Sequence, residues 1–313
     1  MKGLLAFAAR RGSGALAAIV GVSLAVFALR HAVPGDPVDA MLGDQATEAD
    51  REALRACLDL DKEIGGQLVA FGRDVASLTL GISCRDRRST VASLIAAAYP
   101  RTLELALAAV AIALVVAIPL GTLASLRPGS WLDGAVMGVS LGGAAVPTMW
   151  LGPLLLAFFY VKLGWLPGPA DPPSAPGALI LPAVTLASHL AAMLARMTRS
   201  ALLDVSGEDF MRTARAKGLT RSRALLRHAL PNALLPVVTV AGIQLGALLA
   251  GAIVTEKIFA RPGLGTLLLD AISVRDWKVV QGVVLVVACS YVVVNLLVDV
   301  AYAALDPRIR LSR

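Results

Sequence analysis

Several long apolar segments constrain this sequence more than any other feature. A helix needs about 20 mostly apolar residues to cross the hydrocarbon core of a bilayer. The chain has 313 residues, of which 57% are hydrophobic and 16% are charged, and a mean hydropathy of +0.73 is not typical of soluble domains. Six segments qualify as spans: residues 12–29, 102–126, 135–161, 179–197, 233–254 and 278–300. The sequence therefore predicts an all-α polytopic membrane protein with about six transmembrane helices, and Pro119, Pro147 and Pro182 should kink or end their helices.

Lysine and arginine residues gather beside alternate ends of these segments. Because short cytoplasmic loops are enriched in such residues, they predict cytoplasmic N- and C-termini and a cytoplasmic loop between the fourth and fifth helices. These cations are Lys2, Arg10, Arg11, Arg127, Arg196, Arg199, Arg212, Arg215, Lys217, Arg221, Arg223, Arg227, Arg308, Arg310 and Arg313. The predicted divisions are a first helix in 1–30, an extracytoplasmic segment in 31–101, a helical core in 102–305 and a cytoplasmic tail in 306–313. The net charge of +7 follows from this topology and does not indicate nucleic-acid binding, because no aromatic reading surface accompanies the cations.

The polar stretch between the fourth and fifth segments, residues 203–232, carries helix-end signals and is called the polar loop below. Ser206 precedes Asp209 by three residues, which is the spacing of a capping box. Glu208 and Asp209 would lie in the first helical turn, where the helix dipole favours anions. Gly218 fits the left-handed position that ends a helix. The turns before it carry cations, which the dipole also favours: Arg212, Arg215 and Lys217.

A second short helix is expected after the glycine. Thr220 can cap its start, and Pro231, which has no backbone N–H, is expected to stop it. The polar loop therefore predicts a rigid, basic helix–glycine–helix element. Such an element offers a docking surface to a soluble partner.

The predicted extracytoplasmic segment carries two of the three cysteines, Cys57 and Cys84. Residues 47–63 and 65–78 favour two helices, the first with Thr47 as its N-cap. In an oxidising compartment the two thiols can form a disulfide. Two unpaired thiols are the alternative that the sequence leaves open.

Motifs for nucleotide or zinc binding are missing from the sequence. It contains no G-x-x-x-x-G-K-[ST], because none of its six lysines follows a glycine, and it contains no H-E-x-x-H or C-x-x-C. We therefore expect no bound cofactor, no metal site and no catalytic residue in this chain.

One pattern resembles that of a serine hydrolase. Gly138-Val-Ser-Leu-Gly142 matches G-x-S-x-G, but a nucleophile elbow needs a strand–turn–helix context, and this stretch lies inside an apolar segment. An intramembrane hydrolase that uses Ser140 and His189 is one interpretation. The favoured interpretation is that Gly138 and Gly142 form a small-residue packing face.

Three polar residues interrupt the apolar segments: His189, Gln244 and Asn295. Polar groups at membrane depth are candidates for a translocation path, and hydrogen bonding to a neighbouring helix is the alternative. Residues 256–265 include Glu256, Lys257 and Arg261 and follow the fifth segment. They either form part of an outer gate or docking rim, or they are a solvated interfacial loop.

The polar loop also matches a known motif, E-A-A-x-x-x-G-x9-I-x-L-P. The aligned residues are Arg212, Thr213, Ala214, Gly218, His228, Leu230 and Pro231. Arg212 replaces the glutamate and His228 replaces the isoleucine. With these residues the chain resembles the inner-membrane permease subunits of ABC importers in the oligopeptide, dipeptide and nickel family, where R-T-A-R-A-K-G is typical of the peptide branch. Further matching stretches are Val33-Pro-Gly-Asp-Pro37, Tyr99-Pro-Arg-Thr-Leu-Glu-Leu105, Arg261-Pro-Gly-Leu-Gly265, Arg275-Asp276 with Val280-Gln281, and Leu305-Asp-Pro-Arg-Ile-Arg310.

The resemblance implies a multi-pass protein of the bacterial inner membrane that imports short peptides, or alternatively nickel or another metal chelate. It implies a second homologous permease, two ABC ATPase subunits that use ATP and Mg, and an extracytoplasmic binding protein. It also implies that the polar loop is a coupling loop that docks on an ATPase subunit. The residues expected to act there are Arg212, Thr213, Ala214, Arg215, Lys217, Gly218, Leu230 and Pro231. A passive channel is a further alternative, but it leaves the capped helices of the loop unexplained.

Overall fold

The computed structural model describes residues 2–32, 37–42 and 46–305, and these residues form helices without a strand element. The helices in chain order are α1 (Lys2–Ala32), α2 (Pro37–Leu42), α3 (Glu48–Cys57), α4 (Ile64–Ala76), α5 (Val91–Leu126), α6 (Trp131–Ala145), α7 (Thr148–Leu155), the π-helical η1 (Leu156–Lys162), α8 (Ile180–Ser206), α9 (Asp209–Ala216), α10 (Arg221–Ala224), the π-helical η2 (Leu225–Ala229), α11 (Leu230–Gly251), α12 (Ile253–Ile258), α13 (Leu264–Ser273) and α14 (Trp277–Leu305). The predicted all-α class is confirmed for this part of the chain. The tail predicted in 306–313 lies outside the described residues.

Helices long and apolar enough to cross a membrane account for most of the predicted spans. Among the described residues they are Val91–Leu126, Ile180–Ser206, Arg221–Gly251 and Trp277–Val300, and the stretch Gly12–Ala28 of α1 is apolar but shorter. The predicted second span begins earlier than expected, because Thr90 is extended (φ −72°, ψ 148°) and its side chain accepts a hydrogen bond from the backbone N–H of Ser93.

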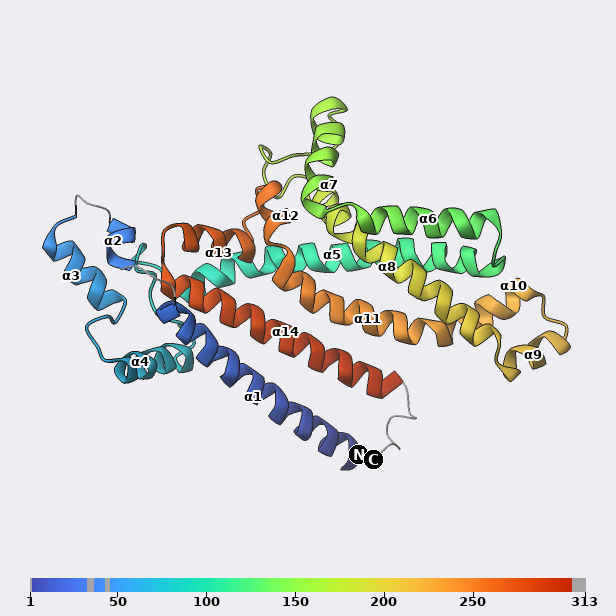
Figure 1. Ribbon diagram of the computed structural model, residues 1–313, viewed down its shortest axis with the longest axis horizontal. Coiled ribbons are helices and arrows are strands. Elements are labelled where there is room, and N and C mark those ends of the chain that lie inside the picture. The colour runs from blue at the N-terminus through green and yellow to red at the C-terminus, as the bar shows by residue number, and fades with distance from the viewer. Residues whose placement is uncertain (1, 33–36, 43–45, 306–313) are drawn as a thin grey trace.

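The third predicted span, 135–161, is bent rather than straight, as predicted from Pro147. Helix α6 and the α7–η1 segment meet at an angle of 98°. The cause is Pro147, whose ring holds the preceding Val146 in an extended conformation (φ −77°, ψ 118°) and so ends α6. The α7–η1 segment consequently projects away from the bundle (Figure 1). Of the other two prolines expected to kink or end helices, Pro119 lies inside α5, which continues past it, and Pro182 lies in the first turn of α8.

The centre of the bundle is the crossing of α5 and α8. One face of α5 carries a small or aliphatic residue at every fourth position: Leu105, Ala109, Ala113, Ala117 and Gly121. The first four are completely buried. A Cβ added to Gly121 would lie 2.5 Å from the carbonyl oxygen of Ala195 on α8. This row of small residues therefore lets the two helix backbones approach closely.

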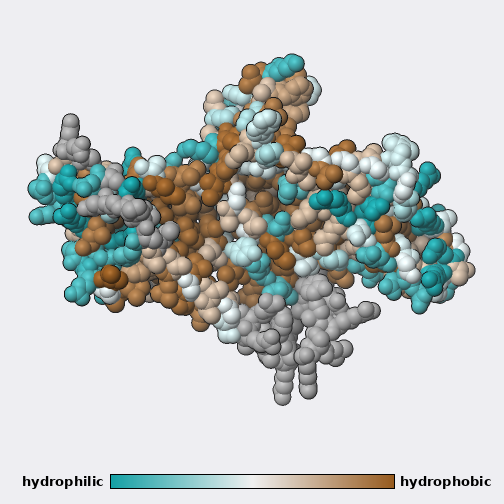
Figure 2. Space-filling model, viewed as in Figure 1, coloured by the Kyte–Doolittle hydropathy of each residue, from teal (hydrophilic) through white to brown (hydrophobic). Residues whose placement is uncertain are grey.

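Polar side chains gather at the two ends of the molecule, and apolar side chains cover the middle (Figure 2). One end consists of α9 and α10 of the polar loop, and the other consists of α2, α3 and α4 (Figure 1). We call residues 37–90, without 43–45, the cap. An apolar belt between two polar ends is the surface expected of a protein that spans a bilayer.

The cap has its own small core and a covalent link. Helix α3 is capped by Thr47, as predicted, and it ends at Cys57, while α4 matches the second predicted helix. Of the two alternatives for the cysteines, the structure contains the Cys57–Cys84 disulfide, with 5.9 Å between the two Cα atoms. Leu54 and Leu58 are buried beside it, together with Val38.

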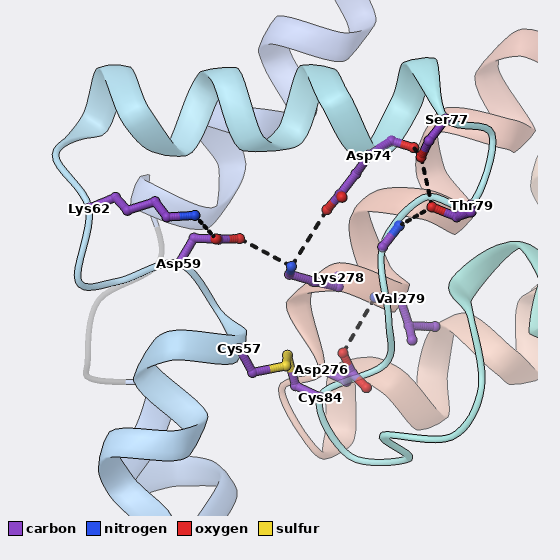
Figure 3. A network of polar contacts seen from close by, with 11 residues as sticks. Cys57, Asp59, Lys62, Asp74, Ser77, Thr79, Cys84, Asp276, Lys278 and Val279 are labelled. Carbon is purple, nitrogen blue, oxygen red and sulfur yellow. Dashed lines mark hydrogen bonds and ion pairs between the residues drawn. A yellow bond between two sulfur atoms is a disulfide. The ribbon is translucent and has the colours of Figure 1, made fainter.

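The cap is also held by the start of α14 (Figure 3). Asp276 is 2% exposed, and its Oδ2 accepts a hydrogen bond of 2.6 Å from the Ser83 hydroxyl and one of 3.3 Å from the Arg85 backbone N–H. Trp277 packs against the cap core. These contacts give the Arg275-Asp276 motif a structural role that the sequence alone did not indicate.

Glu256 is buried in the short helix α12, with 1% exposed. Its carboxylate accepts hydrogen bonds from the Thr102 hydroxyl on α5 (2.5 Å) and from the backbone N–H of Gly265 (2.7 Å). Burial raises the pKa of Glu256, while its hydrogen bonds oppose the shift. A Cβ added to Gly263 would overlap the same carboxylate, so the buried glutamate explains why the Pro-Gly-Leu-Gly stretch needs small residues.

Arg261 is buried as well, with 3% exposed, and its Nη2 lies 3.1 Å from Glu104 Oε2 on α5. The interpretation of residues 256–265 as a solvated loop is therefore wrong for Glu256 and Arg261. Lys257 is solvated, with a side chain that is 59% exposed and pairs with Asp270, but it lies in α12 rather than in a loop. The mistake arose because the hydrogen-bond partners on α5 lie more than 150 residues earlier in the chain.

Candidate functional site

The polar loop begins where α8 ends, and the predicted capping box at Ser206 is wrong. Ser206 is the last residue of α8, and its hydroxyl donates to the carbonyl of Leu202 at 2.6 Å. A hydroxyl satisfied within its own helix is not available as a cap for the next one. The N-cap of α9 is Glu208, which is extended and makes no side-chain capping bond.

Helix α9 has one buried face and one exposed face. Met211 and Ala214 are 3% and 8% exposed, and both belong to a cluster that closes the loop on itself. The buried members of that cluster are Leu202, Met211, Ala214, Ala224, Leu225, Ala229 and Ala233. Ala214 was expected to lie on the docking face, but it lies inside this cluster. Its small size is therefore required by contacts within the chain.

Gly218 forms the bend between α9 and α10. Its φ is +91°, as the left-handed prediction requires, and a Cβ added there would meet nothing within 4 Å. The next residue, Leu219, donates its N–H to the carbonyl of Ala214 at 3.3 Å, which closes the end of α9. Thr220 is the N-cap of α10, although its side chain makes no capping bond.

Pro231 does not stop the second helix, contrary to the prediction. Helix α10, η2 and α11 form one continuous span from Arg221 to Gly251. The N–H of Leu230 reaches the carbonyl of Leu225, five residues earlier, and this wider π turn precedes the proline. Pro231 then stands in the first turn of α11, where a missing N–H is tolerated. The polar loop is thus built into the membrane helix that follows it.

The outward surface of the loop is basic. The exposed cations are Arg212, Arg215, Lys217, Arg221, Arg223 and Arg227. The closest acidic partner of Arg212 is Asp209 at 3.4 Å, and both side chains are largely exposed, at 73% and 96%. The cations therefore remain available to an external partner.

Two apolar residues on this surface were missed by the sequence analysis. Phe210 is 44% exposed and Leu226 is 52% exposed. Phe210 precedes the buried Met211 in a strongly amphipathic helix, so it falls on the polar face of that helix. An aromatic residue on a polar face is the sequence signal that identifies it. Exposed aromatic residues among cations are typical of docking surfaces.

The loop is anchored to the bundle through α8. Arg199 makes a two-pronged contact with Asp133 at the start of α6, with Nε–Oδ1 at 2.5 Å and Nη2–Oδ2 at 2.6 Å. Asp133 also accepts the N–H of Gly129 at 2.9 Å. A bidentate pair fixes orientation as well as distance, so α6 and α8 are held together close to the loop.

The three residues predicted to line a path do not form one cluster. His189 Nδ1 lies 3.3 Å from the carbonyl oxygen of Ala144 on α6. Gln244 and Asn295 are half-buried on α11 and α14, and Asn295 Oδ1 is buried without a hydrogen-bond partner in the described part of the chain. No hydrogen bond among the described residues joins the three.

Ser140 does not have the geometry of a hydrolase nucleophile. It is 5% exposed in the middle of α6 rather than at a strand–helix turn. The packing-face interpretation of Gly138 and Gly142 is also wrong within this chain, because a Cβ added to either would meet nothing within 4 Å. These glycines lie on an open face of α6.

Solved structures with the same fold are chains of ABC transporters. A chain of the inward-facing MetNI methionine ABC transporter matches with a TM-score of 0.56 and 22% identity, over 68% of this chain and 96% of that chain. A chain of an amino acid ABC transporter crystallised with histidines matches with a TM-score of 0.51 and 17% identity, over 69% and 94%. At these identities the likeness shows the fold alone.

Sequence relatives extend over the full chain. The di/tripeptide transport system permease protein DppB of Pseudomonas aeruginosa is 42% identical over 99% of this chain and 100% of that protein. The dipeptide permease DppB of Escherichia coli K12 is 40% identical, over 98% and 99%. The glutathione permease GsiC of the same strain is 38% identical, over 98% and 99%.

Two family descriptions cover most of the sequence. The N-terminal part of the membrane component of binding-protein-dependent transport systems matches residues 4–106, and the inner-membrane component of these systems matches residues 117–311. They confirm the resemblance to ABC importer permeases and, with the apolar helices, a multi-pass protein of the inner membrane. The chain belongs to the family of inner-membrane components of binding-protein-dependent transport systems.

Proposed function

We propose that this chain is the permease subunit of an ATP-driven importer and that it translocates short peptides. The observation that carries the proposal is the polar loop: a basic surface with an exposed aromatic residue, continuous with a membrane helix at both ends. The peptide substrate follows from relatives of 38–42% identity whose names state di- or tripeptides, dipeptides or glutathione.

The proposed topology has six spans, of which α1 is the first and the α6–α7–η1 pair is the third. Both termini and the polar loop then lie on the cytoplasmic side, between the fourth and fifth spans. The distribution of lysine and arginine supports this orientation, and the cap would lie outside. The opposite positions of the loop and the cap agree with it (Figure 1).

In the proposed mechanism the loop transmits movement from the ATPase. ATP binding would close two ATPase subunits around the nucleotide and carry the loops of two paired permeases along. Because α10, η2 and α11 form one helical span, a displacement of the loop becomes a tilt of α11. The surface residues proposed to contact the ATPase are Arg212, Thr213, Arg215 and Lys217, with Gly218, Ala214, Leu230 and Pro231 fixing the shape.

The partners belong to the same proposal. A second homologous permease can pack on the open face of α6, where Gly138 and Gly142 permit close approach and Val139 is 72% exposed. An external binding protein would deliver the peptide. ATP and Mg would be used by the ATPase subunits, and this chain would bind neither. His189, Gln244 and Asn295 stay candidates for the translocation path.

The test is ATP-dependent peptide uptake by proteoliposomes that contain the complete transporter. Gly218→Asp places a side chain on a φ of +91° and adds an acid to the basic surface, so uptake should be abolished while the protein still inserts in the membrane. Gly164→Asp is the matched control, because Gly164 also has a positive φ and open space around it.

Three results would contradict the proposal. Uptake by the Gly218→Asp variant at the normal rate would exclude a coupling role for the loop, and uptake without ATP would indicate a channel. Labelling of Ser140 by a serine-reactive probe would favour the hydrolase. Competition with dipeptides and with nickel chelates identifies the substrate class.

A further inference from the structure

Lys278 bridges the cap and the membrane bundle. It lies in the first turn of α14, and its Nζ is 3.1 Å from Asp59 Oδ2 and 3.5 Å from Asp74 Oδ2 (Figure 3). Asp59 follows α3, while Asp74 belongs to α4, so one ammonium group contacts two elements of the cap. The side chains of Lys278 and Asp59 are only 16% and 15% exposed. Solvent screening is therefore weaker here than for an ion pair on an open surface.

The chain around this bridge is shaped to fit it. Gly81 has φ +81°, and a Cβ there would come within 2.7 Å of Asp74 Oδ2 and 3.2 Å of Lys278 Cδ. The Cys57–Cys84 disulfide closes the segment that carries both aspartates. Burial raises the pKa of Asp59, but hydrogen bonds from Lys62 and Lys278 outweigh it, and the pKa lies below its usual value. The carboxylate is therefore charged at neutral pH.

Helix α14 is in turn packed closely against α11. A Cβ added to Gly242 would be 2.5 Å from Val298 Cγ2, and a Cβ added to Gly246 would be 2.9 Å from Tyr291 Cδ2. Helix α11 continues without a break into η2 and α10 of the polar loop. A contiguous path of packed helices thus leads from Lys278 to the polar loop at the other end of the molecule.

We infer that Lys278 is a positioning residue that joins the cap to α14, so that a load on the cap reaches the polar loop through α14 and α11. This inference rests on the proposed function, in which the load is the docking of an external binding protein. Without the ammonium group, two half-buried carboxylates lose the cation they share and repel each other. The cap then keeps its contacts with Asp276 and Trp277 at the start of α14, but it transmits the load less effectively.

Lys62 provides a matched comparison. Its Nζ lies 2.6 Å from Asp59 Oδ1, so it binds the same carboxylate as Lys278. Lys62 belongs to the cap itself, however, and its side chain is 47% exposed. Removing Lys62 weakens a pair inside the cap, whereas removing Lys278 breaks the ion pairs between the cap and the bundle.

The experiment measures ATP hydrolysis by the reconstituted transporter, with and without its external binding protein loaded with a dipeptide. Lys278→Met should lower the stimulation by the binding protein about tenfold, a typical size for coupling between sites, and leave basal hydrolysis unchanged. Lys278→Arg should retain stimulation, and so should Lys62→Met. Gly218→Asp, in contrast, should lose basal hydrolysis. That loss tests the coupling role of the polar loop independently of Lys278.

A second measurement uses variants of the two cap aspartates that contact Lys278. The double variant Asp59→Asn, Asp74→Asn should also lose stimulation, and its α4 amides should exchange with deuterium faster while those of α9 do not change. The inference is overturned if Lys278→Met retains full stimulation, or if basal and stimulated hydrolysis fall together. It is also overturned if Lys62→Met has the same effect as Lys278→Met.

Discussion

The polar loop and the cap lie at opposite ends of the bundle (Figure 1), and they are attached to it in different ways. The loop is continuous with α8 on one side and with α11 on the other, and its buried cluster comes almost entirely from residues 201–233. The cap is held by side chains far away in the chain, such as Ser83 and Asp276, which are 193 positions apart. Attachment through the helical backbone differs physically from attachment through side-chain contacts.

Because of this difference, the loop and the cap should respond differently to a displacement of the bundle. Helix α11 transmits displacement to α10 through its own hydrogen bonds, and the buried cluster joins both to α8 and α9. The loop therefore moves with α8 and α11 whatever its surface residues are. The cap follows α14 only while an ion bridge, a few hydrogen bonds and the packing of Trp277 hold it. We therefore expect loop function to depend on a small number of shape-determining residues, and cap function to depend on individual polar contacts.

The largest effect is expected from Ala214→Glu in the loop. Ala214 is 8% exposed within the loop cluster, and a carboxylate there would be buried without a partner. Transport should be abolished while the protein remains in the membrane, as measured by peptide uptake and by the amount of protein in isolated membranes. Ala216→Glu is the control, because Ala216 is exposed on the same helix. Normal uptake by Ala214→Glu would show that the loop does not depend on its cluster.

The next largest effect concerns the cap disulfide. Replacing Cys57 and Cys84 by serine opens a loop with a sequence separation of 27, which should lower the free energy of cap unfolding by about 3–4 kcal/mol. Deuterium exchange of the α4 amides measures this change. Cys289→Ser is the control, because Cys289 is a free cysteine in α14. Unchanged exchange in α4 would mean that the side-chain contacts alone hold the cap.

Asp276→Ala tests one of those contacts. The Ser83 hydroxyl and the Arg85 N–H would lose a buried acceptor, at a cost of about 2 kcal/mol. Faster exchange in residues 83–85 is the expected observation. Asp270→Ala removes a carboxylate that is 68% exposed and pairs with Lys257, and it should cost less than about 0.5 kcal/mol. Equal effects of the two variants would contradict the role assigned to Asp276.

The smallest effect on stability is expected from Arg212→Gln. Its ion pair with Asp209 is 3.4 Å long, and both side chains are largely exposed, so the free energy of unfolding should change by less than about 0.5 kcal/mol. Thermal denaturation of the purified chain measures it. A loss above about 1 kcal/mol would show that this cation belongs to the internal structure of the loop rather than to a surface available for docking.

The sequence predicted what local patterns determine. The left-handed Gly218 and the Thr47 cap depend on residues a few positions apart, and both agree with the structure. Of the six apolar segments, four lie in helices of the described chain that are long enough to span, and the third is a bent pair. Ser206 and Pro231 were misinterpreted for a related reason. The Ser206 hydroxyl donates to the carbonyl of Leu202 in its own helix instead of capping α9. The π turn before Pro231 lets the helix continue although proline has no N–H.

Contacts between distant segments were not predictable from one sequence. A solvated loop is one of the two interpretations of Glu256 and Arg261, because their side-chain partners Thr102 and Glu104 lie far away in the sequence, on α5. Lys278 gave no signal for the same reason. The bend at Pro147 was indicated, but its angle of 98° depends on how α7 packs on the rest of the bundle.

Site-specific photo-cross-linking in the assembled transporter tests the central claim most directly. A photoreactive residue at Phe210, which is 44% exposed on the polar loop, should cross-link to an ATPase subunit. The same residue at Leu78, which is 81% exposed on the cap, should not. Absence of an ATPase cross-link from position 210, or its presence at position 78, would contradict the account.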